Sequence, residues 1–141
     1  MNQFNKVLLI DDDNIFNFLN QKIIEFGNFS KNVSSHVDAN KALNELRLLS
    51  ESGSEDLPDV IFLDINMPVM DGWEFLEEFE KLPESIINKC SVYILTSSID
   101  PKDIEKSKKY DSVKDFFSKP LSDEILETLL GKVNTEFNTH Q

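Results

Sequence analysis

DVIFLD, residues 59–64, is the stretch that decides the fold class of this 141-residue chain. Four apolar residues in a row, without alternation, are typical of a strand that is buried on both faces, as in a parallel sheet. A carboxylate inside such a strand would carry a large desolvation cost. Asp64 is therefore expected at the end of the strand, where the chain reaches the surface.

Three further apolar runs end in polar side chains in the same way. They are KVLLID (6–11) followed by Asp12, CSVYILT (90–96) with Thr96 before Ser97, and VKDFFS (113–118) followed by Lys119. The weaker run VSSHV (33–37) is a fifth strand candidate. In open α/β sheets, ligands bind in the crevice outside the carboxyl ends of the strands. The sequence thus predicts that carboxylates, hydroxyls and one ammonium group meet in a single crevice.

Helices are predicted between these strands over residues 14–26, 39–50, 73–82, 101–109 and after Ser122. Their predicted inward faces are Ile15, Leu19, Ile23 and Phe26; Ala42, Leu43, Leu46 and Leu49; Phe75, Leu76 and Phe79; and Ile125, Leu126, Leu129, Leu130 and Val133. Residues 83–89 are expected to form a connection longer than a tight turn. Strands that alternate with helices predict one α/β domain with a parallel sheet, helices on both faces and right-handed crossovers.

Composition excludes several classes of protein. Acidic residues outnumber basic ones 26 to 14, and a formal charge of −12 argues against a nucleic-acid groove and against binding to anionic membranes. Cys90 is the only cysteine, so no intramolecular disulfide forms, and its position favours a small buried core residue. The N-terminus lacks a signal peptide and no run reaches membrane-spanning length, which predicts a cytoplasmic protein.

Four motifs carry a family resemblance: LLIDDD (8–13), FLDINMPVMDG (62–72), ILTSS (94–98) and FFSKP (116–120). In order and approximate spacing they resemble the receiver domain of bacterial two-component response regulators, over roughly residues 5–133. The resemblance implies a flavodoxin-like (βα)5 fold, doubly wound, with strand order 2-1-3-4-5. It assigns residues 1–133 to the receiver and 134–141 to a polar C-terminal tail. Without an output domain, the chain is similar to the single-domain regulators typified by the chemotaxis regulator.

The resemblance implies a role for each side chain at the crevice. Asp64 would be the phosphoacceptor, because a carboxylate can attack phosphorus to give a labile acyl phosphate. Mg²⁺ would be held by Asp11, Asp12, Asp64 and the backbone carbonyl of Asn66, since hard oxygen ligands suit this ion. Asp12 resembles the direct ligand, and Asp11 resembles a ligand that acts through water.

The remaining roles concern the phosphoryl group itself. Lys119 would contact its oxygens as a point charge, and Pro120 favours a cis peptide after it. Thr96 would hydrogen-bond a phosphoryl oxygen and move with Phe116 as the switch. Asn66 and Ser98 occupy the positions that shape the lifetime of the acyl phosphate in this family.

Partners follow from the same resemblance. His36 and His140 lack companions at catalytic or metal-binding spacing, so the phosphoryl donor is expected to be another protein, a histidine kinase or a histidine phosphotransfer protein. A downstream protein would bind the surface formed by the helix over 101–109, the strand over 113–118 and the last helix. Lysines in the first of these, Lys102, Lys106, Lys108 and Lys109, suit either an acidic partner or a solvated face. The sequence leaves homodimer formation open.

Other interpretations compete with the switch. Asp13 is expected to cap the following helix rather than join the site, and Asp71-Gly72 to provide turn and cap chemistry. A haloacid-dehalogenase-type phosphatase would use Asp11 and Asp13 as nucleophile and acid, but it also needs a later acidic metal pair. A third hypothesis is a receiver-like interaction module that is never phosphorylated. In the leading one, the protein catalyses only its own phosphorylation and dephosphorylation.

Overall fold

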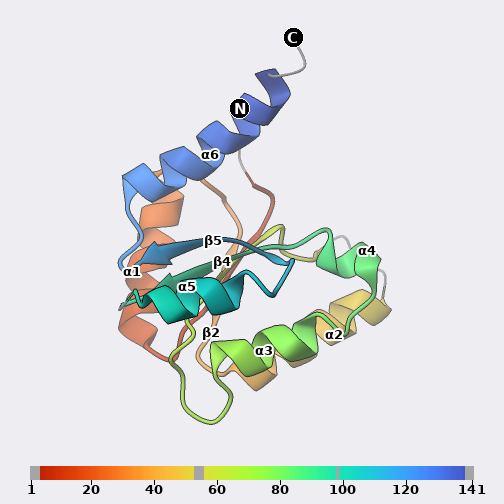
Figure 1. Ribbon diagram of the computed structural model, residues 1–141. Coiled ribbons are helices and arrows are strands. Elements are labelled where there is room, and N and C mark those ends of the chain that lie inside the picture. Colours follow the sequence, from red (N-terminus) through yellow and green to blue (C-terminus); the bar gives the residue numbers. More distant parts are fainter. Residues whose placement is uncertain (1–3, 53–55, 98, 139–141) are drawn as a thin grey trace.

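The computed structural model describes residues 4–52, 56–97 and 99–138, with side chains described as far as Gly131. Strands and helices alternate along this part of the chain (Figure 1). The elements are β1 (Val7–Ile10), α1 (Asn14–Phe26), β2 (Val33–His36), α2 (Ala39–Glu51), β3 (Val60–Leu63), α3 (Gly72–Phe79), α4 (Glu84–Ile87), β4 (Ser91–Thr96), α5 (Pro101–Ser107), β5 (Val113–Ser118) and α6 (Asp123–Asn138).

The strands form one sheet in the order β2-β1-β3-β4-β5, and all neighbouring strands are parallel. This confirms the predicted doubly wound, flavodoxin-like fold. β1 and β3 lie inside the sheet and are buried along their whole length. The edge strand β2 is only partly buried, which explains its weaker apolar pattern.

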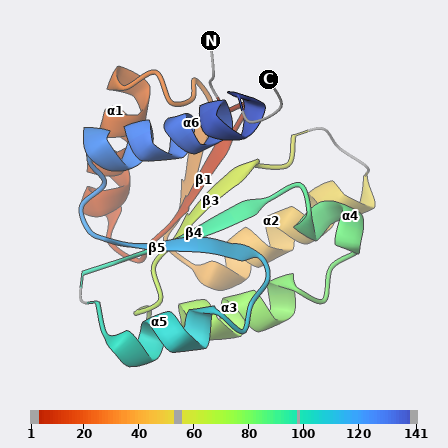
Figure 2. The same cartoon turned by 45° about the horizontal axis from the view of Figure 1, so that its top comes forward.

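Two cores form because successive side chains of a strand point to opposite faces. Leu8 and Ile10 of β1 pack in the cluster that contains the buried residues of α2 and α3. Val7 and Leu9 pack in the cluster that contains buried residues of α1 and α6. Figure 2 shows α1 and α6 on one side of the sheet and α2, α3 and α5 on the other.

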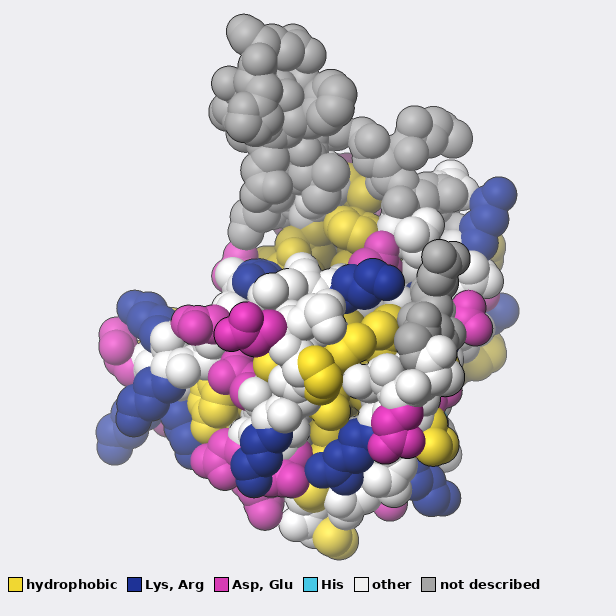
Figure 3. Space-filling view, turned by 90° about the vertical axis from the view of Figure 1, so that its right-hand side faces the viewer, with side chains coloured by type: hydrophobic (Ala, Val, Ile, Leu, Met, Phe, Trp, Pro, Cys, Tyr) yellow, Lys and Arg dark blue, Asp and Glu magenta, His cyan; other side chains and the backbone are white. Residues whose placement is uncertain are grey.

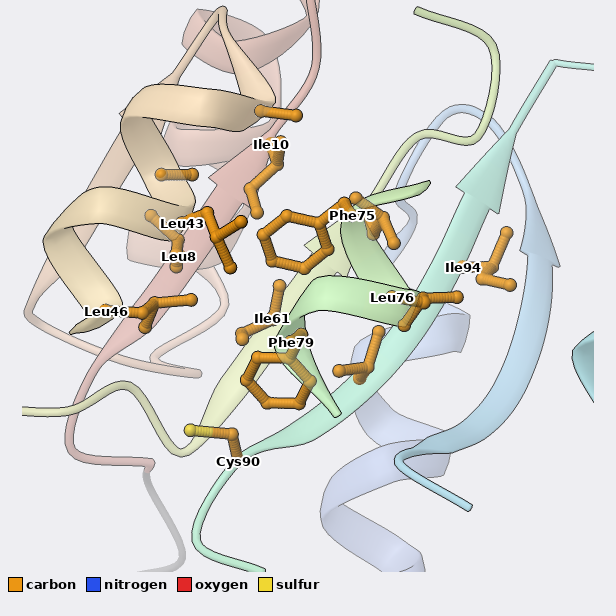
Figure 4. Packing of buried hydrophobic residues seen from close by; sticks show 14 of the residues in the cluster. Leu8, Ile10, Leu43, Leu46, Ile61, Phe75, Leu76, Phe79, Cys90 and Ile94 are labelled. Carbon is orange, nitrogen blue, oxygen red and sulfur yellow. The ribbon is translucent and has the colours of Figure 1, made fainter. Parts of the chain in front are cut away.

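The α3 side of the sheet is packed by aromatic rings. Phe75 and Phe79 stack with their centroids 5.8 Å apart, and both lie near Ile61 of β3 (Figure 4). Cys90 lies at the margin of the same cluster and is 1% exposed, as the sequence predicts.

Aspartates begin four of the helices. Asp13, Asp38, Asp71 and Asp100 each accept hydrogen bonds from backbone N–H groups in the first turn of α1, α2, α3 and α5. Asp71 forms a capping box with Glu74. These contacts satisfy backbone donors that a helix start leaves without partners. The predicted roles of Asp13 and Asp71 as caps are confirmed.

The predicted inward face of α1 is wrong. Ile15, Leu19 and Phe26 are 70%, 49% and 82% exposed, whereas Asn17 and Asn20 are buried. Ile23, the fourth member of that face, is partly buried and packs against the core. With α1 rotated in this way, Asp13 caps the helix and Asn17 reaches the end of β1, and apolar spacing does not report either contact.

Several bounds also differ from the prediction. Helix α3 ends at Phe79 rather than at residue 82, and α5 ends at Ser107 rather than at residue 109. The connection over 83–89 contains the short helix α4, which follows Pro83. Helix α6 continues to Asn138, beyond residue 133, so most of the predicted tail is helical backbone. The side chain of Val133 and all of His140 lie outside the described residues.

Charged side chains of both signs mix on the surface. Figure 3 shows the face that lies on the right-hand side of Figure 1. On this face Lys and Arg side chains are mixed with Asp and Glu side chains. This face therefore offers no basic stripe of the kind that binds nucleic acid. Within the described ranges, every helix is too short or too polar to cross a bilayer.

Candidate functional site

The register of the sheet places two carboxylates side by side. Ile10 of β1 pairs with Leu63 of β3, so the next residues, Asp11 and Asp64, leave the sheet together. The backbone N–H of Asp64 donates to the carbonyl of Ile10 at 2.9 Å. Both aspartates are 4% exposed. Two charges of the same sign are thus held close together with little contact with water, an arrangement that calls for a cation.

Asp12 completes an acidic cluster. One carboxylate oxygen from each of Asp11, Asp12 and Asp64 lies within 4.8 Å of the others, and Asp12 is the exposed member. Three carboxylates with an opening to solvent are a donor set that suits Mg²⁺, which binds through one or two carboxylates and keeps several waters. These residues could hold a divalent ion.

Lys119 supplies the positive charge in this structure. Its ammonium nitrogen lies 2.6 Å from Oδ2 of Asp11 and 3.3 Å from Oδ2 of Asp64, and the side chain is 8% exposed. The backbone N–H of Lys119 donates to the carbonyl of Thr96, which fixes the end of β5 against β4. The Lys119–Pro120 peptide is cis, as predicted.

Phe16 forms a second contact with the ammonium group. Its ring centroid lies 4.5 Å from Nζ of Lys119. A cation over an aromatic face is attracted by the quadrupole of the ring. Sequence reasoning missed Phe16, because the apolar spacing of α1 gives no sign that one of its rings faces the crevice.

Burial and charge shift two pKa values in the site. Burial raises the pKa of Asp64, and the Asp11 carboxylate adds to this, while the N–H of Asn66 and the charge of Lys119 oppose it. For Lys119, burial alone would lower the pKa. Its hydrogen bond to Asp11 and the charge of Asp64 outweigh burial and raise the pKa, so Lys119 is charged at neutral pH.

Thr96 and Asn66 are joined by a hydrogen bond. The side-chain amide of Asn66 donates to Oγ1 of Thr96 at 3.2 Å, and the backbone N–H of Asn66 donates to Oδ1 of Asp64 at 3.1 Å. Thr96 is fully buried and Asn66 is exposed. Asn66 therefore links the end of β3 to the end of β4, a contact that no sequence pattern announces.

The other predicted site residues lie where the fold places them. Phe116 is partly buried and packs against the α2–α3 core. Asp13 accepts from the N–H groups of Ile15 and Phe16 and acts as a cap. Ser98 lies outside the described residues. The metal-binding role of the Asn66 carbonyl stays a prediction.

Gly72 follows the cap residue Asp71, and the sequence predicts only turn and cap chemistry for this pair. A Cβ at this position would lie 2.6 Å from Cα of Ile65 and 2.9 Å from the carbonyl oxygen of Asp64. Only glycine permits this approach of α3 to the backbone that carries Asp64. Gly72 thus positions the loop between β3 and α3, which begins with Asp64 and is called the acceptor loop below.

The phosphatase hypothesis finds little support in this geometry. Its proposed acid, Asp13, is engaged as a helix cap, and Asp100, the acidic residue after β4, caps α5 by accepting from the N–H of Lys102. Neither Asp13 nor Asp100 belongs to the acidic cluster found among the described residues.

Comparison with known proteins gives a consistent picture. The family model of the response regulator receiver domain matches residues 7–130. The probable methanogenesis regulatory protein FilR2 of Methanothrix harundinacea is 28% identical over 127 residues, which are 90% of this chain and 79% of that protein.

Solved structures agree with the sequence comparison. A two-component response regulator from Cytophaga hutchinsonii superposes with a TM-score of 0.84 at 39% identity, over 94% of this chain and 98% of that one. The chemotaxis protein CheY4 of Vibrio cholerae superposes with a TM-score of 0.72 at 25% identity, over 92% and 98% of the two chains.

Proposed function

This chain belongs to the response regulator receiver family, and we propose that it accepts a phosphoryl group on Asp64 and thereby switches a partner-binding surface. One observation supports the proposal most directly. A buried carboxylate, Asp64, lies beside two further carboxylates and within 3.3 Å of the ammonium group of Lys119. Phosphoryl transfer to a carboxylate requires both a nucleophile and neutralisation of charge, and this crevice brings them together.

The donor in this proposal is a phosphohistidine on a histidine kinase or a histidine phosphotransfer protein. A carboxylate oxygen of Asp64 attacks phosphorus, an O–P bond forms, and the P–N bond to the imidazole breaks. The imidazole nitrogen keeps the electron pair of that bond and is protonated. The product is an acyl phosphate, and attack by water on its phosphorus returns the Asp64 carboxylate and inorganic phosphate.

Asp11, Asp12, Asp64 and the backbone carbonyl of Asn66 would hold Mg²⁺ in this reaction. The ion supplies charge neutralisation to the phosphoryl oxygens. Lys119 provides a second positive charge, and its contact with Asp11 keeps it in the crevice before the phosphoryl group arrives. Phe16 restricts the movement of the same ammonium group.

The switch would begin at Thr96. A phosphoryl group on Asp64 adds about −1.5 to −2 charges and strong acceptor oxygens. The hydroxyl of Thr96 would turn from its bond with Asn66 to donate to one of these oxygens. Phe116 lies on the neighbouring strand β5, where it pairs with Ile94 of β4. Movement of Thr96 at the end of β4 would therefore release space for the Phe116 ring.

The surface that responds would be α5, β5 and α6. Pro101, Lys102, Glu105 and Lys106 of α5, together with Lys109 after the helix, line a surface hollow of about 450 Å³. Lys106 lies over the ring of Trp73 at 4.8 Å, and Lys108 pairs with Glu105, so two of the four lysines already have partners. Lys102 and Lys109 are the better candidates for contact with an acidic partner.

The proposal has three further parts. The protein works in the cytoplasm, it acts on no separate substrate, and it catalyses only its own phosphorylation and dephosphorylation.

The test is chemical phosphorylation. The protein is incubated with acetyl phosphate and Mg²⁺, the acyl phosphate is reduced with borohydride, and the modified residue is located by peptide mass spectrometry. We expect the label on Asp64 and none in the Asp64→Asn variant. Asp59→Asn is the matched control, because Asp59 lies at the opposite end of β3, where it accepts from the N–H groups of Asn5 and Lys6.

Each outcome separates the hypotheses. Label on Asp11 would favour the phosphatase. An unmodified protein that also fails to bind Mg²⁺ would favour the interaction module. Labelling of Asp64→Asn at the wild-type level would contradict the assignment of the acceptor.

A further inference from the structure

Helix α1 turns two amide side chains into the protein interior. Asn17 and Asn20 are 3% and 2% exposed, and their spacing of three residues puts them on one face of the helix. The Nδ2 group of Asn17 donates to the backbone carbonyl of Asp11 at 2.9 Å. This bond determines the orientation of the amide and directs its Oδ1 atom away from Asp11.

The two amide oxygens lack a donor. Oδ1 of Asn17 and Oδ1 of Asn20 are buried, and neither receives a hydrogen bond from the residues that the structure describes. A buried acceptor without a partner destabilises the folded state, because it has lost its hydrogen bonds to water. Two such atoms, three residues apart on one face of a helix, can be satisfied by a shared donor.

A small cavity lies between these amides and the sheet. Its wall consists of Leu9, Ile10, Asp11, Asn17, Asn20, Phe62, Asp64 and Leu95, and its volume is about 10 Å³. The volume is the space that the centre of a water molecule can occupy. A buried water needs roughly 10–15 Å³ of such space and two to four polar partners. At about 10 Å³ the cavity lies at the lower limit of this range, so it admits at most one water molecule, and the two amide oxygens are the polar partners.

We propose that Asn17 and Asn20 form an internal hydration site behind the acceptor crevice, occupied by one long-lived water molecule. The water donates one proton to Oδ1 of Asn17 and the other to Oδ1 of Asn20. With its oxygen satisfied in this way, Asn17 keeps its amide hydrogens on the Asp11 carbonyl. This bond joins α1 to the end of β1, which carries Asp11 and Asp12.

A metal ion fits this cavity less well. Mg²⁺ and Ca²⁺ take about six or more oxygen ligands, whereas Leu9, Phe62 and Leu95 make much of this wall apolar. Water has two donor hydrogens, and the site presents two acceptors without donors. The match in number and in volume identifies the occupant as water.

The test measures water contacts by NMR. In ¹⁵N-labelled protein without phosphoryl donor or Mg²⁺, cross-peaks between water and the side-chain amide protons of Asn17 and Asn20 are recorded in laboratory-frame and rotating-frame experiments. We expect opposite signs in the two experiments, which indicates a residence time longer than nanoseconds. Asn14, an exposed residue of the same helix, is the control and should show only short-lived contacts.

A variant and a crystal structure complete the test. Asn20→Leu removes one acceptor and fills the space, so the long-lived contact at Asn17 should be lost. A crystal structure of the unmodified protein should show one density peak about 3 Å from both Oδ1 atoms, and this measurement serves even if the variant does not fold. Wild-type amides without long-lived water, or a peak that grows strongly after exchange into rubidium salt, would overturn the proposal.

Discussion

The ammonium nitrogen of Lys119 lies 2.6 Å from Oδ2 of Asp11, and the two side chains are only 8% and 6% exposed. The second carboxylate, Asp64, is farther from Nζ, at 3.3 Å. Lys119 is therefore held mainly by Asp11, a residue at the end of a different strand from the acceptor. The cation can stay in the crevice while Asp64 changes its chemical state.

This pairing predicts a strong coupling between the two residues. Lys119→Met should lower the free energy of unfolding by roughly 3 kcal/mol, because it leaves buried carboxylates without a cation. In an Asp11→Asn background the same change should cost less, with a coupling energy of about 1–3 kcal/mol. Urea unfolding without Mg²⁺ gives the free energies of unfolding of the wild type, the two single variants and the double variant.

The control for this cycle is Lys108→Met. Lys108 pairs with Glu105 at 3.2 Å, but both side chains are exposed. Exposed pairs contribute little, so a change within about 0.5 kcal/mol is expected. Equal losses at Lys119 and Lys108, or additive effects of Lys119→Met and Asp11→Asn, would show that burial does not strengthen the Lys119 pair.

Asp64→Asn should stabilise the protein in the absence of Mg²⁺. Burial and the neighbouring Asp11 charge raise the pKa of Asp64, so its ionised form destabilises the fold at neutral pH. Removing that charge should raise Tm by about 3 °C or more, which corresponds to roughly 1 kcal/mol for a domain of this size. Thermal unfolding at pH 7 measures the shift.

The sign of the pH dependence follows. A raised carboxyl pKa means that the stability associated with neutral Asp64 is present at low pH and is lost as pH rises through the folded-state pKa. The advantage of Asp64→Asn should therefore shrink as pH falls. Asp12→Asn, at an exposed neighbour, should change Tm less at every pH. A variant that is less stable than the wild type at pH 7 would contradict this account.

Phe16→Leu should lower the free energy of unfolding more than Phe18→Leu does. Phe16 is partly buried against Lys119 at 4.5 Å, whereas the Phe18 ring is 59% exposed and lies 5.4 Å from Lys22. Cation–π contacts contribute about 2 kcal/mol when desolvated and 0.5–1 kcal/mol when exposed. The comparison of the two variants by urea unfolding tests whether the crevice is closed to water, and equal losses would speak against it.

Two glycines offer opposite outcomes for the same substitution. Gly72→Ala should destabilise by at least about 2 kcal/mol, because its Cβ would lie 2.6 Å from backbone that must shift. Gly131→Ala meets nothing within 4 Å on α6 and should stabilise by about 0.5–1 kcal/mol. Tm values give both signs, and a neutral Gly72→Ala would remove the argument for close packing of α3 on the acceptor loop.

Cys90 should resist alkylation in the folded protein. Burial, assisted by the charge of Asp59, raises the pKa of its thiol to about 12, and the residue is 1% exposed. At pH 8 the thiolate, which is the reactive form, is therefore nearly absent. Iodoacetamide labelling followed by mass spectrometry should proceed only as the protein unfolds, and labelling that is equally fast with and without urea would contradict it.

Local patterns were sufficient for most of the fold. Apolar and polar residues do not alternate in DVIFLD, because both faces of β3 are covered. An unbroken apolar run of this kind can be recognised in the sequence. Asp13, Asp38, Asp71 and Asp100 cap the helices that follow them, since a cap is a contact between residues close in sequence. α1 was the failure: its apolar residues are largely outside, and two asparagines are inside.

By itself, then, the sequence determined which strands form and which side chains stand at their ends, because burial on two faces and helix capping are written in short stretches. Only the tertiary structure decided that Lys119 pairs more closely with Asp11 than with Asp64, that Asn66 binds Thr96, and that Asn17 reaches the end of β1. Each of these contacts depends on the register of parallel strands or on the rotation of a helix against the sheet. Both are set by packing over the whole domain.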